Sequence, residues 1–463
     1  MQNDSKTFTL YGWTVCTWVL VVSFQYGYHI SVLNQLQAVL TCRNVDTGIY
    51  YGLPVCIPMS DATFSVVTSI YTVGGLIGSM GASVAMDRFG RRGASRISAV
   101  MTALGALLMG VSSSVVALLL GRGLVGIGAG LGICVGPIYL SEIAPSKIRG
   151  SVGVLTQLAI VLGIMLTQAM GLYLATPRQW RFVLFISSAV SIGQICLTPF
   201  IVESPSYLGR KSLVEDQKSA ARRLWGSAKS PSVSARDAND PSLQDPLLDD
   251  PEGQLEPAPR VAAITVTQLL QARELRQPLL IVSFAMLSQQ VSGINAVLYY
   301  SNDILSKALP ELGPFVSLGI TIINVFMTFP PIFLIERTGR KWLLQASVAG
   351  ALVSHIAVGI GLNTGTVLLS SIAVMTFVTS FAIGLGPVPF VMISEVSPPH
   401  AVSALSTVGL SLNWIANFVV GLVFLPLRNL LASGDVMKEG RIFYVFAGVL
   451  FLTSGVLFRV YRG

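Results

Sequence analysis

Apolar stretches about as long as a membrane crossing recur along the 463-residue chain, separated by shorter polar segments. A helix needs roughly 20 consecutive apolar residues to span a bilayer. Twelve stretches approach this length, at residues 12–33, 63–86, 97–115, 117–140, 151–175, 182–202, 279–301, 314–335, 342–362, 366–394, 402–427 and 443–461. The pattern predicts an all-α membrane protein with twelve transmembrane helices. We interpret the first stretch as a span and not as a signal peptide, because eleven more follow it.

The twelve spans form two sets of six. We expect an N-terminal six-helix bundle over residues 1–202, a cytoplasmic linker over 203–277 and a C-terminal six-helix bundle over 278–463. Residues 227–259 are rich in Ser, Asp and Pro, a composition typical of disorder. The flanking segments at 207–226 and 264–276 have helical composition, so we expect short helices there on the cytoplasmic face.

Two polar motifs occur once in each half at nearly the same offset. "DRFGRR" (87–92) follows the second span and "ERTGRK" (336–341) follows the eighth. "SEIAPSKIRG" (141–150) follows the fourth span and "SEVSPPHAVS" (394–403) follows the tenth. The offsets of 249 and 253 residues indicate a duplicated six-helix unit. Two parallel halves with a substrate site between them are typical of major facilitator transporters.

These motifs bring acidic and basic residues together at the cytoplasmic ends of the spans. We expect ion pairs between the two bundles to latch one transport state and to release in the other. Simple topogenic charge is the alternative interpretation. The residues assigned to this cytoplasmic latch from the motifs are Asp87, Arg88, Arg91, Arg92, Glu142, Arg149, Glu336, Arg337, Arg340 and Glu395.

Composition and charge agree with a membrane protein. Only 11% of the residues are charged and 52% are hydrophobic, whereas soluble domains carry about 25% charged residues. The net charge of +8 does not indicate a nucleic-acid partner, because 22 of the 30 Lys and Arg residues fall in segments on one side of the predicted membrane. By the positive-inside rule this side is cytoplasmic, and both termini lie there.

Five cysteines are present, and two of them, Cys42 and Cys56, lie in the first non-cytoplasmic loop. Oxidation is permitted on that side of the membrane, so a disulfide and two free thiols are both open. No spacing typical of a metal site occurs, and we expect no metal and no cofactor. We also expect no enzymatic activity, because no nucleophile, base and orienting group cluster in any cytoplasmic segment.

Uncharged amides are concentrated within the apolar spans. Gln289, Gln290 and Asn295 lie in the seventh span, and we expect them to spread over one broad face of the helix. Amides both donate and accept hydrogen bonds, which suits hydroxyl-rich ligands, whereas single amides in membranes more often join helices. The size of the set favours ligand binding. Its other members are Gln157, Gln168, Asn324, Asn413 and Asn417.

The segment "RQPLLIVSFAMLSQQVSGINAVLYYS" (276–301) resembles the seventh helix of the sugar porters, a branch of the major facilitator superfamily with glucose facilitators and xylose–proton symporters. "GRGLVGIGAG" (121–130), "PIYLSEIAPSKIRG" (137–150), "VESPSYL" (202–208) and "GPVP" (386–389) are similar to other motifs of this family. "QYGYH" (25–29) with "LPVCIPM" (53–59) is most similar to fungal vacuolar-membrane hexose-transporter-like members. The resemblance favours the vacuolar membrane over the plasma membrane.

The resemblance also implies roles for individual residues. Glu203 joins the cytoplasmic latch, although Ser206 and Val402 stand where the family has further arginines. Ala382 and Phe390 replace a Glu and a Trp that contact sugar in facilitators, which puts glucose itself in doubt. The positions that correspond to substrate-binding residues are His29, Gln157, Gln289, Gln290, Asn295, Asn324, Phe390, Asn413 and Trp414.

His29 lies deep in the first span, where an ionisable residue is costly unless it is paired or faces water. Symporters of the family carry an Asp at this position and facilitators an Asn, so we expect His29 to face a wet central cavity. Hydrogen bonding, pH sensing with proton coupling, and plain packing are three open roles for it.

The sequence thus predicts a transporter of a small polyhydroxylated solute, with a monosaccharide favoured, that works by alternating access. We expect facilitated diffusion, because no span carries a carboxylate to bind a proton. A nutrient receptor or trafficking factor without turnover, and a transporter of a non-sugar solute, are the alternatives. The expected partners are the solute and the lipid bilayer, without nucleic acid. Sorting machinery is a further candidate partner at the acidic dileucine-like "QDPLLDD" (244–250) of the linker.

Overall fold

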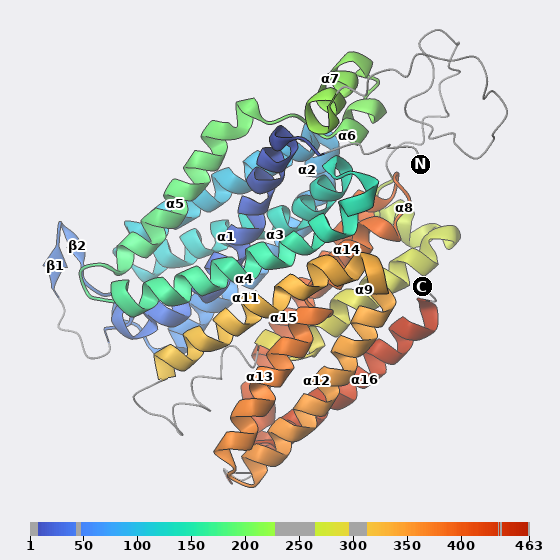
Figure 1. Cartoon of the computed structure of the whole chain (residues 1–463). Coiled ribbons are helices and arrows are strands. Elements are labelled where there is room, and N and C mark those ends of the chain that lie inside the picture. Colours follow the sequence, from blue (N-terminus) through green and yellow to red (C-terminus); the bar gives the residue numbers. More distant parts are fainter. Residues whose placement is uncertain are drawn as a thin grey trace, which may run out of the picture.

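The computed structural model describes residues 8–42, 48–226, 264–295, 313–433, 435 and 438–461. Long helices from the two halves of the chain form two bundles that lie side by side (Figure 1). The N-terminal half contributes α1 (Leu10–Leu40), α2 (Asp61–Gly110), α3 (Val115–Ile143), α4 (Arg149–Leu174) and α5 (Trp180–Leu197). The C-terminal half contributes α9 (Arg276–Val291), α11 (Gly313–Thr338), α12 (Arg340–Asn363), α13 (Val367–Ile383), α14 (Val388–Glu395), α15 (Val402–Ala432) and α16 (Arg441–Val460).

Short elements decorate the two ends of the bundles. A two-stranded hairpin of β1 (Ile49–Tyr50) and β2 (Leu53–Pro54) stands at one end, antiparallel with Ile49 opposite Pro54. The other elements are η1 (Ser146–Ile148), η2 (Thr198–Phe200), α6 (Pro205–Arg210), α7 (Val214–Trp225), α8 (Val266–Gln271) and η4 (Arg273–Leu275). Helices α6 and α7 occupy the segment expected at 207–226, and α8 and η4 the one at 264–276. The stretch 227–259 lies outside the described residues.

Ten helical stretches of the described residues are long and apolar enough to cross a membrane. One of them, Val66–Gly110, is 45 residues long and contains both the second and the third predicted span. Helix α9, with 16 residues, holds the first part of the seventh predicted span. Each of the twelve predicted spans therefore overlaps helix within the described residues.

Two glycines mark the internal repeat in the backbone itself. Gly90 has a φ of 76° and bends α2 between its two spans, and Gly339 has a φ of 81° just before α12. Their ψ angles of −179° and 160° place both in a region that only glycine adopts readily and that costs other residues roughly 1–3 kcal/mol. Each glycine is followed by an arginine, Arg91 or Arg340, that begins the next helical segment.

Two predicted spans are not single helices. The span expected over 366–394 is interrupted between Ile383 and Val388, within "GLGP", because glycine and proline are poor residues for a helix interior. Helix α9 ends at Val291, and Gly293 with a φ of 76° breaks the span expected over 279–301, whose last residues, 296–301, lie outside the described part. Broken helices expose backbone groups that other residues must satisfy.

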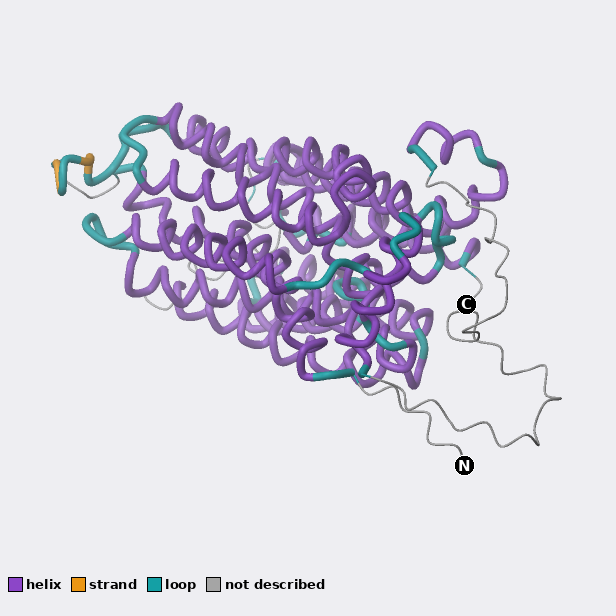
Figure 2. Tube along the Cα trace, turned by 90° about the horizontal axis from the view of Figure 1, so that it is seen from above, coloured by secondary structure: helices purple, strands orange, loops and turns teal. Residues whose placement is uncertain are grey.

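Apolar residues of both halves pack together where the bundles meet. Phe390, Val402 and Trp414 of the C-terminal half belong to the same buried cluster as Val135 and Ile138 of α3. Helix α4 packs on α11, and α2 packs on α15. Seen from above, the long helices of both bundles run in nearly the same direction (Figure 2).

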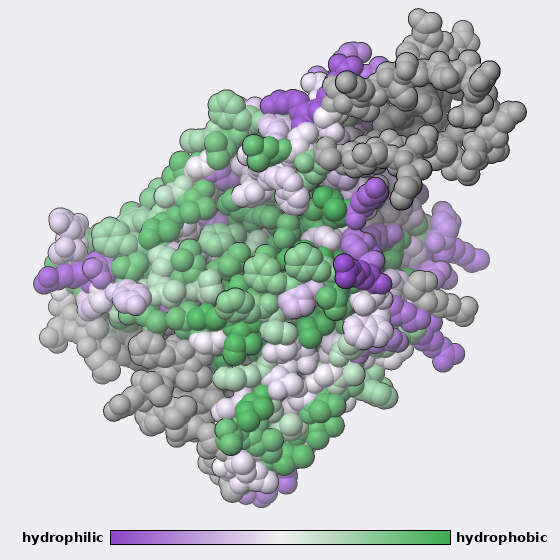
Figure 3. Space-filling model, in the orientation of Figure 1, coloured by the Kyte–Doolittle hydropathy of each residue, from purple (hydrophilic) through white to green (hydrophobic). Residues whose placement is uncertain are grey.

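The surface has an apolar belt between two polar ends (Figure 3). The start of α1, the end of α16 and the short helices α6, α7 and α8 lie at one end, and the β hairpin lies at the other (Figures 1 and 2). An apolar belt with polar ends is what a bilayer requires of a multi-pass protein.

Candidate solute-binding site and cytoplasmic latch

Four amide side chains form one continuous chain of hydrogen bonds. The Asn295 Nδ2 donates to Gln290 Oε1 at 2.8 Å, and the Gln290 Nε2 donates to Asn413 Oδ1 at 3.0 Å. The Asn413 Nδ2 in turn donates to Gln289 Oε1 at 2.8 Å. The break at Gly293 lets Asn295 turn back toward Gln290, so these residues converge instead of spreading over a helix face. This geometry corrects the broad-face expectation.

The chain of amides ends on the broken tenth span. The Gln289 Nε2 donates to the backbone oxygens of Leu385 and Gly386, at 3.0 and 2.9 Å. Gln157 of α4 lies against the same turn, because a Cβ added to Gly386 would lie 3.2 Å from its amide. An amide of the N-terminal bundle therefore lies against the turn on which the amides of the C-terminal bundle end.

Unused hydrogen-bonding capacity makes this region suitable for a hydroxylated solute. Within the described residues, Gln290 and Asn295 each donate through one of two amide N–H groups. Asn324 of α11 is 3% exposed, and its Oδ1 has no hydrogen-bond partner there. Buried polar atoms are normally bonded, so such an acceptor indicates a missing partner.

Trp414 packs in an aromatic socket supplied by the other bundle. Its ring meets the edges of Tyr26 and Tyr71, with centroids 5.7 and 5.6 Å apart. A Cβ added to Gly75 would lie 2.5 Å from the Trp414 ring, so this glycine permits the close approach. Phe390 of α14 is 4% exposed and belongs to the apolar cluster between the bundles.

His29 does not face a wet cavity in this structure, contrary to the expectation from its sequence position. Its side chain is 0% exposed, and its Nε2 lies 2.7 Å from Ser187 Oγ on α5. Ser187 donates to Gln25 Oε1, so it accepts from the imidazole. Gln25 lies one helical turn before His29 on α1, and its Nε2 donates to the Ser187 carbonyl of α5. Both side chains therefore lie on the face of α1 that packs against α5. His29 therefore joins two helices of one bundle.

The N-terminal part of the latch is a desolvated cluster. Arg91 donates to both Glu142 oxygens at 2.9 Å, and its side chain is 0% exposed. Ser204 Oγ also donates to Glu142. The Arg91 guanidinium lies over the Tyr207 ring at 5.6 Å.

Glu203 caps the helix that restarts after Gly90. Its carboxylate accepts from the backbone N–H of Arg91 at 2.8 Å and of Arg92 at 3.1 Å. Burial raises the pKa of the Glu203 carboxyl, and the backbone hydrogen bonds oppose this increase. An anion at a helix N-terminus is favourable because the first N–H groups have no partner within the helix.

The C-terminal part of the latch contains a corresponding arginine–glutamate pair whose side chains are more exposed to solvent. Arg340 donates to Glu395 at 2.6 and 2.8 Å and to Glu336 at 3.3 Å. The side chains of Arg340 and Glu395 are 21% and 25% exposed. Arg91–Glu142 and Arg340–Glu395 are thus equivalent pairs of the two repeats.

Each of these ion pairs lies within its own bundle, and among the described residues they do not form the expected ion pairs between bundles. Among the hydrogen bonds that cross between the bundles, two are made by carboxylates at helix N-termini. Glu336 accepts from the backbone N–H of Ser151, near the start of α4, at 3.2 Å. Asp87 accepts from the hydroxyl of Ser403, near the start of α15, at 3.4 Å. Each bundle thereby contributes one acid to a helix of the other, and the end that carries α6 and α7 is closed.

Four arginines assigned to the latch form no ion pair within the described chain. Arg149 and Arg337 are exposed, and Arg88 lies over the Phe89 ring at 5.4 Å. Exposed charges gain little from pairing. Arg92 donates instead to the Ile201 carbonyl at 2.9 Å.

Val402 is 8% exposed and packs in the apolar cluster between the bundles. Arg149, which precedes the corresponding helix of the other repeat, forms no ion pair in the described structure. Val402 therefore does not leave an ion pair of the described structure without its partner.

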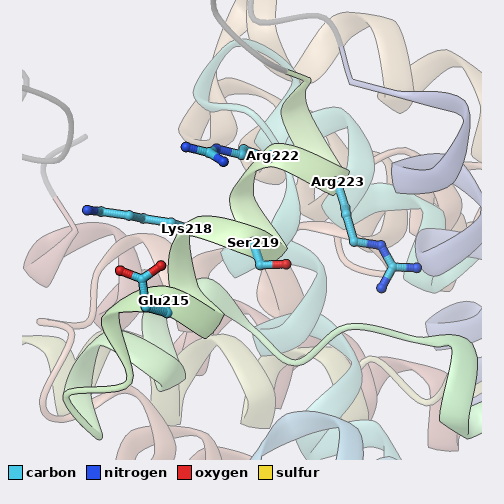
Figure 4. A pocket seen from close by; sticks show the side chains of 5 residues that line it. All are labelled: Glu215, Lys218, Ser219, Arg222 and Arg223. Atoms are coloured by element: carbon cyan, nitrogen blue, oxygen red, sulfur yellow. The ribbon is translucent and has the colours of Figure 1, made fainter.

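Cys42 and Cys56 form a disulfide beside the β hairpin, with Cα atoms 5.2 Å apart. Among the described residues no group of three or more His, Cys, Asp and Glu could hold a metal ion. A surface depression of about 320 Å³ on α7 (Figure 4) does not suit a neutral solute, because four of its five lining residues are charged.

Several residues of the site had no strong sequence signal. Tyr26 and Tyr71 form the socket for Trp414, and Ser187 anchors His29. The glycine pair that includes Gly75 was a usable signal for close helix approach. Aromatic and serine residues in apolar spans are too common to single out.

The chain matches the family described as "Sugar (and other) transporter" over residues 15–461. Its fold is similar to that of the proton:xylose symporter XylE bound to 6-bromo-6-deoxy-D-glucose, with a TM-score of 0.74 at 19% identity, covering 97% of this chain and 95% of the other. The expected twelve-helix major facilitator fold is confirmed.

Curated relatives cover nearly the whole chain. A Saccharomyces cerevisiae protein described as "Probable metabolite transport protein" is 31% identical over 94% of this chain and 89% of its own length. Facilitated glucose transporter member 1 of Gallus gallus is 32% identical over 95% of this chain and 87% of its own length. Vacuolar protein sorting-associated protein 73 of S. cerevisiae is 29% identical over 94% of this chain and 90% of its own length. The family consists of transporters and not of enzymes. The chain therefore belongs to the sugar transporter family of the major facilitator superfamily.

Proposed function

We propose that this protein moves a monosaccharide or a related small polyol across its membrane by facilitated diffusion with alternating access. The observation that carries the proposal is the chain of buried amides from Asn295 to Gln289, which ends at the break in the tenth span. Amides in a dry site bond strongly to hydroxyl groups and have no charge that would select an ion.

The solute binds between the bundles. Gln290, Asn295 and Asn324 supply free donors and an acceptor, and Gln157 contributes from the N-terminal bundle. Gln289 and Asn413 hold this set in place. Trp414 and Phe390 line the apolar side, since sugar rings present C–H faces as well as hydroxyls. Ligand contacts to both bundles couple binding to their relative motion.

Transport is independent of protons. Within the described residues every carboxylate lies at or beyond the end of a spanning helix, as Asp61, Asp87, Glu142, Glu336 and Glu395 do. His29 replaces the acid of proton symporters and bonds to Ser187, so its role is to hold α1 against α5. Uptake into proteoliposomes that is equal at pH 5.5 and pH 7.5, in wild type and in His29→Asn, would support this role. Uptake that follows an imposed proton gradient would contradict it.

The end with α6, α7 and α8 faces the cytoplasm, and both termini lie there. The basic residues gather at this end, and the disulfide lies at the opposite one, where oxidation is permitted. We assign the protein to the vacuolar membrane, with support from the resemblance to vacuolar members and from the relative named for vacuolar protein sorting. The sorting segment proposed at 244–250 lies outside the described residues.

The experiment is a ligand screen followed by substitution at the amides. Purified protein is heated with a panel of sugars and polyols, because a ligand of the native state raises its unfolding temperature. Gln290→Ala and Asn295→Ala should weaken binding of the best ligand by roughly 0.5–1.5 kcal/mol each. The matched control is Gln194→Ala, an equally buried glutamine that bonds to Trp18 within the N-terminal bundle.

Uptake of the labelled ligand into proteoliposomes completes the test. Uptake that both amide substitutions reduce, and the control does not, would support the proposal. Unchanged affinity in both amide variants would make these residues structural. Binding without uptake would favour a nutrient receptor or trafficking factor instead.

A further inference from the structure

A groove of about 370 Å³ lies at the cytoplasmic end of the N-terminal bundle, away from the amides. It is formed where α2 bends at Gly90 and where the last turns of α5 pass into η2. The residues of its wall that matter here are Phe89, Arg92, Arg96, Ile195 and Pro199. Neither the transport site nor the crossing contacts of the latch use this groove.

The groove carries positive charge on one side. Arg92 and Arg96 are one helical turn apart on α2, so their side chains lie on the same face. Arg92 is held by the Ile201 carbonyl at 2.9 Å, and Arg96 is exposed and bonds to no residue that the structure describes. The nearby Glu203 carboxylate is occupied by backbone N–H groups. The Arg92 guanidinium interacts electrostatically with Glu203 but forms no ion pair among the described residues, and neither does Arg96. Two guanidinium groups on one face are well suited to a phosphate, which they can bind bidentately.

The other side of the groove is apolar and faces the membrane. Phe89 is 50% exposed, and Ile195 and Pro199 line the wall beside it. Phe200 and Leu197 continue this surface and are 68% and 54% exposed. The α5 span ends here, so the groove lies at the level where acyl chains give way to headgroups. Basic pockets between transmembrane helices on this side typically bind anionic lipid headgroups.

We propose that this groove binds an anionic phospholipid of the cytoplasmic leaflet. Its phosphate lies between Arg92 and Arg96, and its acyl chains run along Phe89 and the end of α5. A soluble anion would contact the two arginines but would not use the apolar wall of the groove. The backbone N–H of Arg92 is also held by Glu203, so the bound phosphate lies beside the buried N-terminal cluster.

The test measures lipid binding to the full-length protein by native mass spectrometry. Dioleoylphosphatidylserine is titrated in detergent, with dioleoylphosphatidylcholine as the neutral lipid. The wild type should retain phosphatidylserine in preference, and Arg96→Glu should bind it about tenfold more weakly, since one of two charge-assisted contacts becomes repulsive. The matched control is Arg273→Glu, an exposed arginine of η4 at the same end of the molecule.

Two further arms identify the ligand. Arg96→Glu should unfold at the wild-type temperature without lipid, because Arg96 is exposed. Inorganic phosphate at millimolar concentration should not displace the lipid. Equal binding by wild type and Arg96→Glu, an equal loss in Arg273→Glu, or displacement by phosphate would each overturn the proposal of a lipid site.

Discussion

The two cytoplasmic clusters come from the same duplicated motifs but differ in their access to water. In the N-terminal cluster Arg91 is 0% exposed, and α6 covers it with Ser204 and Tyr207. In the C-terminal cluster Arg340 is 21% exposed and is shared between Glu395 and Glu336. Duplication thus preserved the ion pair, whereas the neighbouring elements set its environment.

This difference suggests a division of labour between the repeats. A buried ion pair is costly to break, because one unpaired charge is left out of water. A partly exposed pair contributes less, because water solvates a charge that loses its partner. We infer that the N-terminal cluster holds its bundle together as a rigid unit. The C-terminal cluster, whose Glu336 also reaches the start of α4, changes when the cytoplasmic end opens.

The largest expected effect is a difference in the free energy of unfolding between substitutions of Arg91 and Arg340. Arg91→Ala should lower the free energy of unfolding by about 3–5 kcal/mol, because Glu142 loses its partner in a desolvated site. Arg340→Ala should cost about 1 kcal/mol or less, since water can solvate Glu395. Thermal unfolding of both variants in the same detergent compares them. Equal losses in unfolding temperature would show that burial does not distinguish the clusters.

A smaller difference is expected between the two glycines of the repeat. Gly90→Ala and Gly339→Ala should each cost roughly 1–3 kcal/mol, because both have positive φ with ψ near 180°. Gly90→Ala should cost more, since its new Cβ would lie 2.3 Å from the Glu203 carboxylate, whereas nothing lies within 4 Å of Gly339. Unfolding temperatures provide the measurement. A larger loss for Gly339→Ala would contradict the assignment of the tighter cluster to the N-terminal half.

The smallest expected effect concerns conformation more than stability. Glu336→Gln should shift the protein toward a cytoplasm-open state by roughly 1 kcal/mol, because the charge that faces the start of α4 is lost. Asp87→Asn should shift it less, since its contact with Ser403 is longer, at 3.4 Å.

Spin labels at two exposed positions, Ser146 and Thr338, report the opening through their distance distribution. The labelled protein carries Cys196→Ser, since this cysteine is exposed. Distances that neither substitution changes would remove these crossing contacts from the latch. A larger change with Asp87→Asn would reverse the proposed division of labour.

Much of the fold was predictable because its causes are local or repeated. A bilayer admits a stretch of about 20 apolar residues only as a helix or as part of a closed barrel. The offset between Arg91 and Arg340 identified the repeat, and their acids follow at similar spacing. The helix breaks near Gly293 and Gly386 were not predicted, since glycine is frequent in transmembrane helices that do not break.

The candidate site was predictable in its residue types but not in its connections. The set of Gln and Asn residues in the spans indicated hydrogen bonding. Their order, from Asn295 through Gln290 and Asn413 to Gln289, depends on the break at Gly293. For His29 the expected environment was wrong: its position in the sequence suggested a wet cavity, whereas residues of α5 bury it.

The sequence by itself determined the twelve spans, the internal repeat and the polar residues placed in an apolar setting. Each follows from the composition of a short segment or from the recurrence of a motif. The tertiary structure decided which acid each arginine binds, which helices meet between the bundles and which side chains are dry. These properties depend on the rotation of each helix and on neighbours distant in the chain, as when α6 covers Arg91 while Arg340 stays open to water.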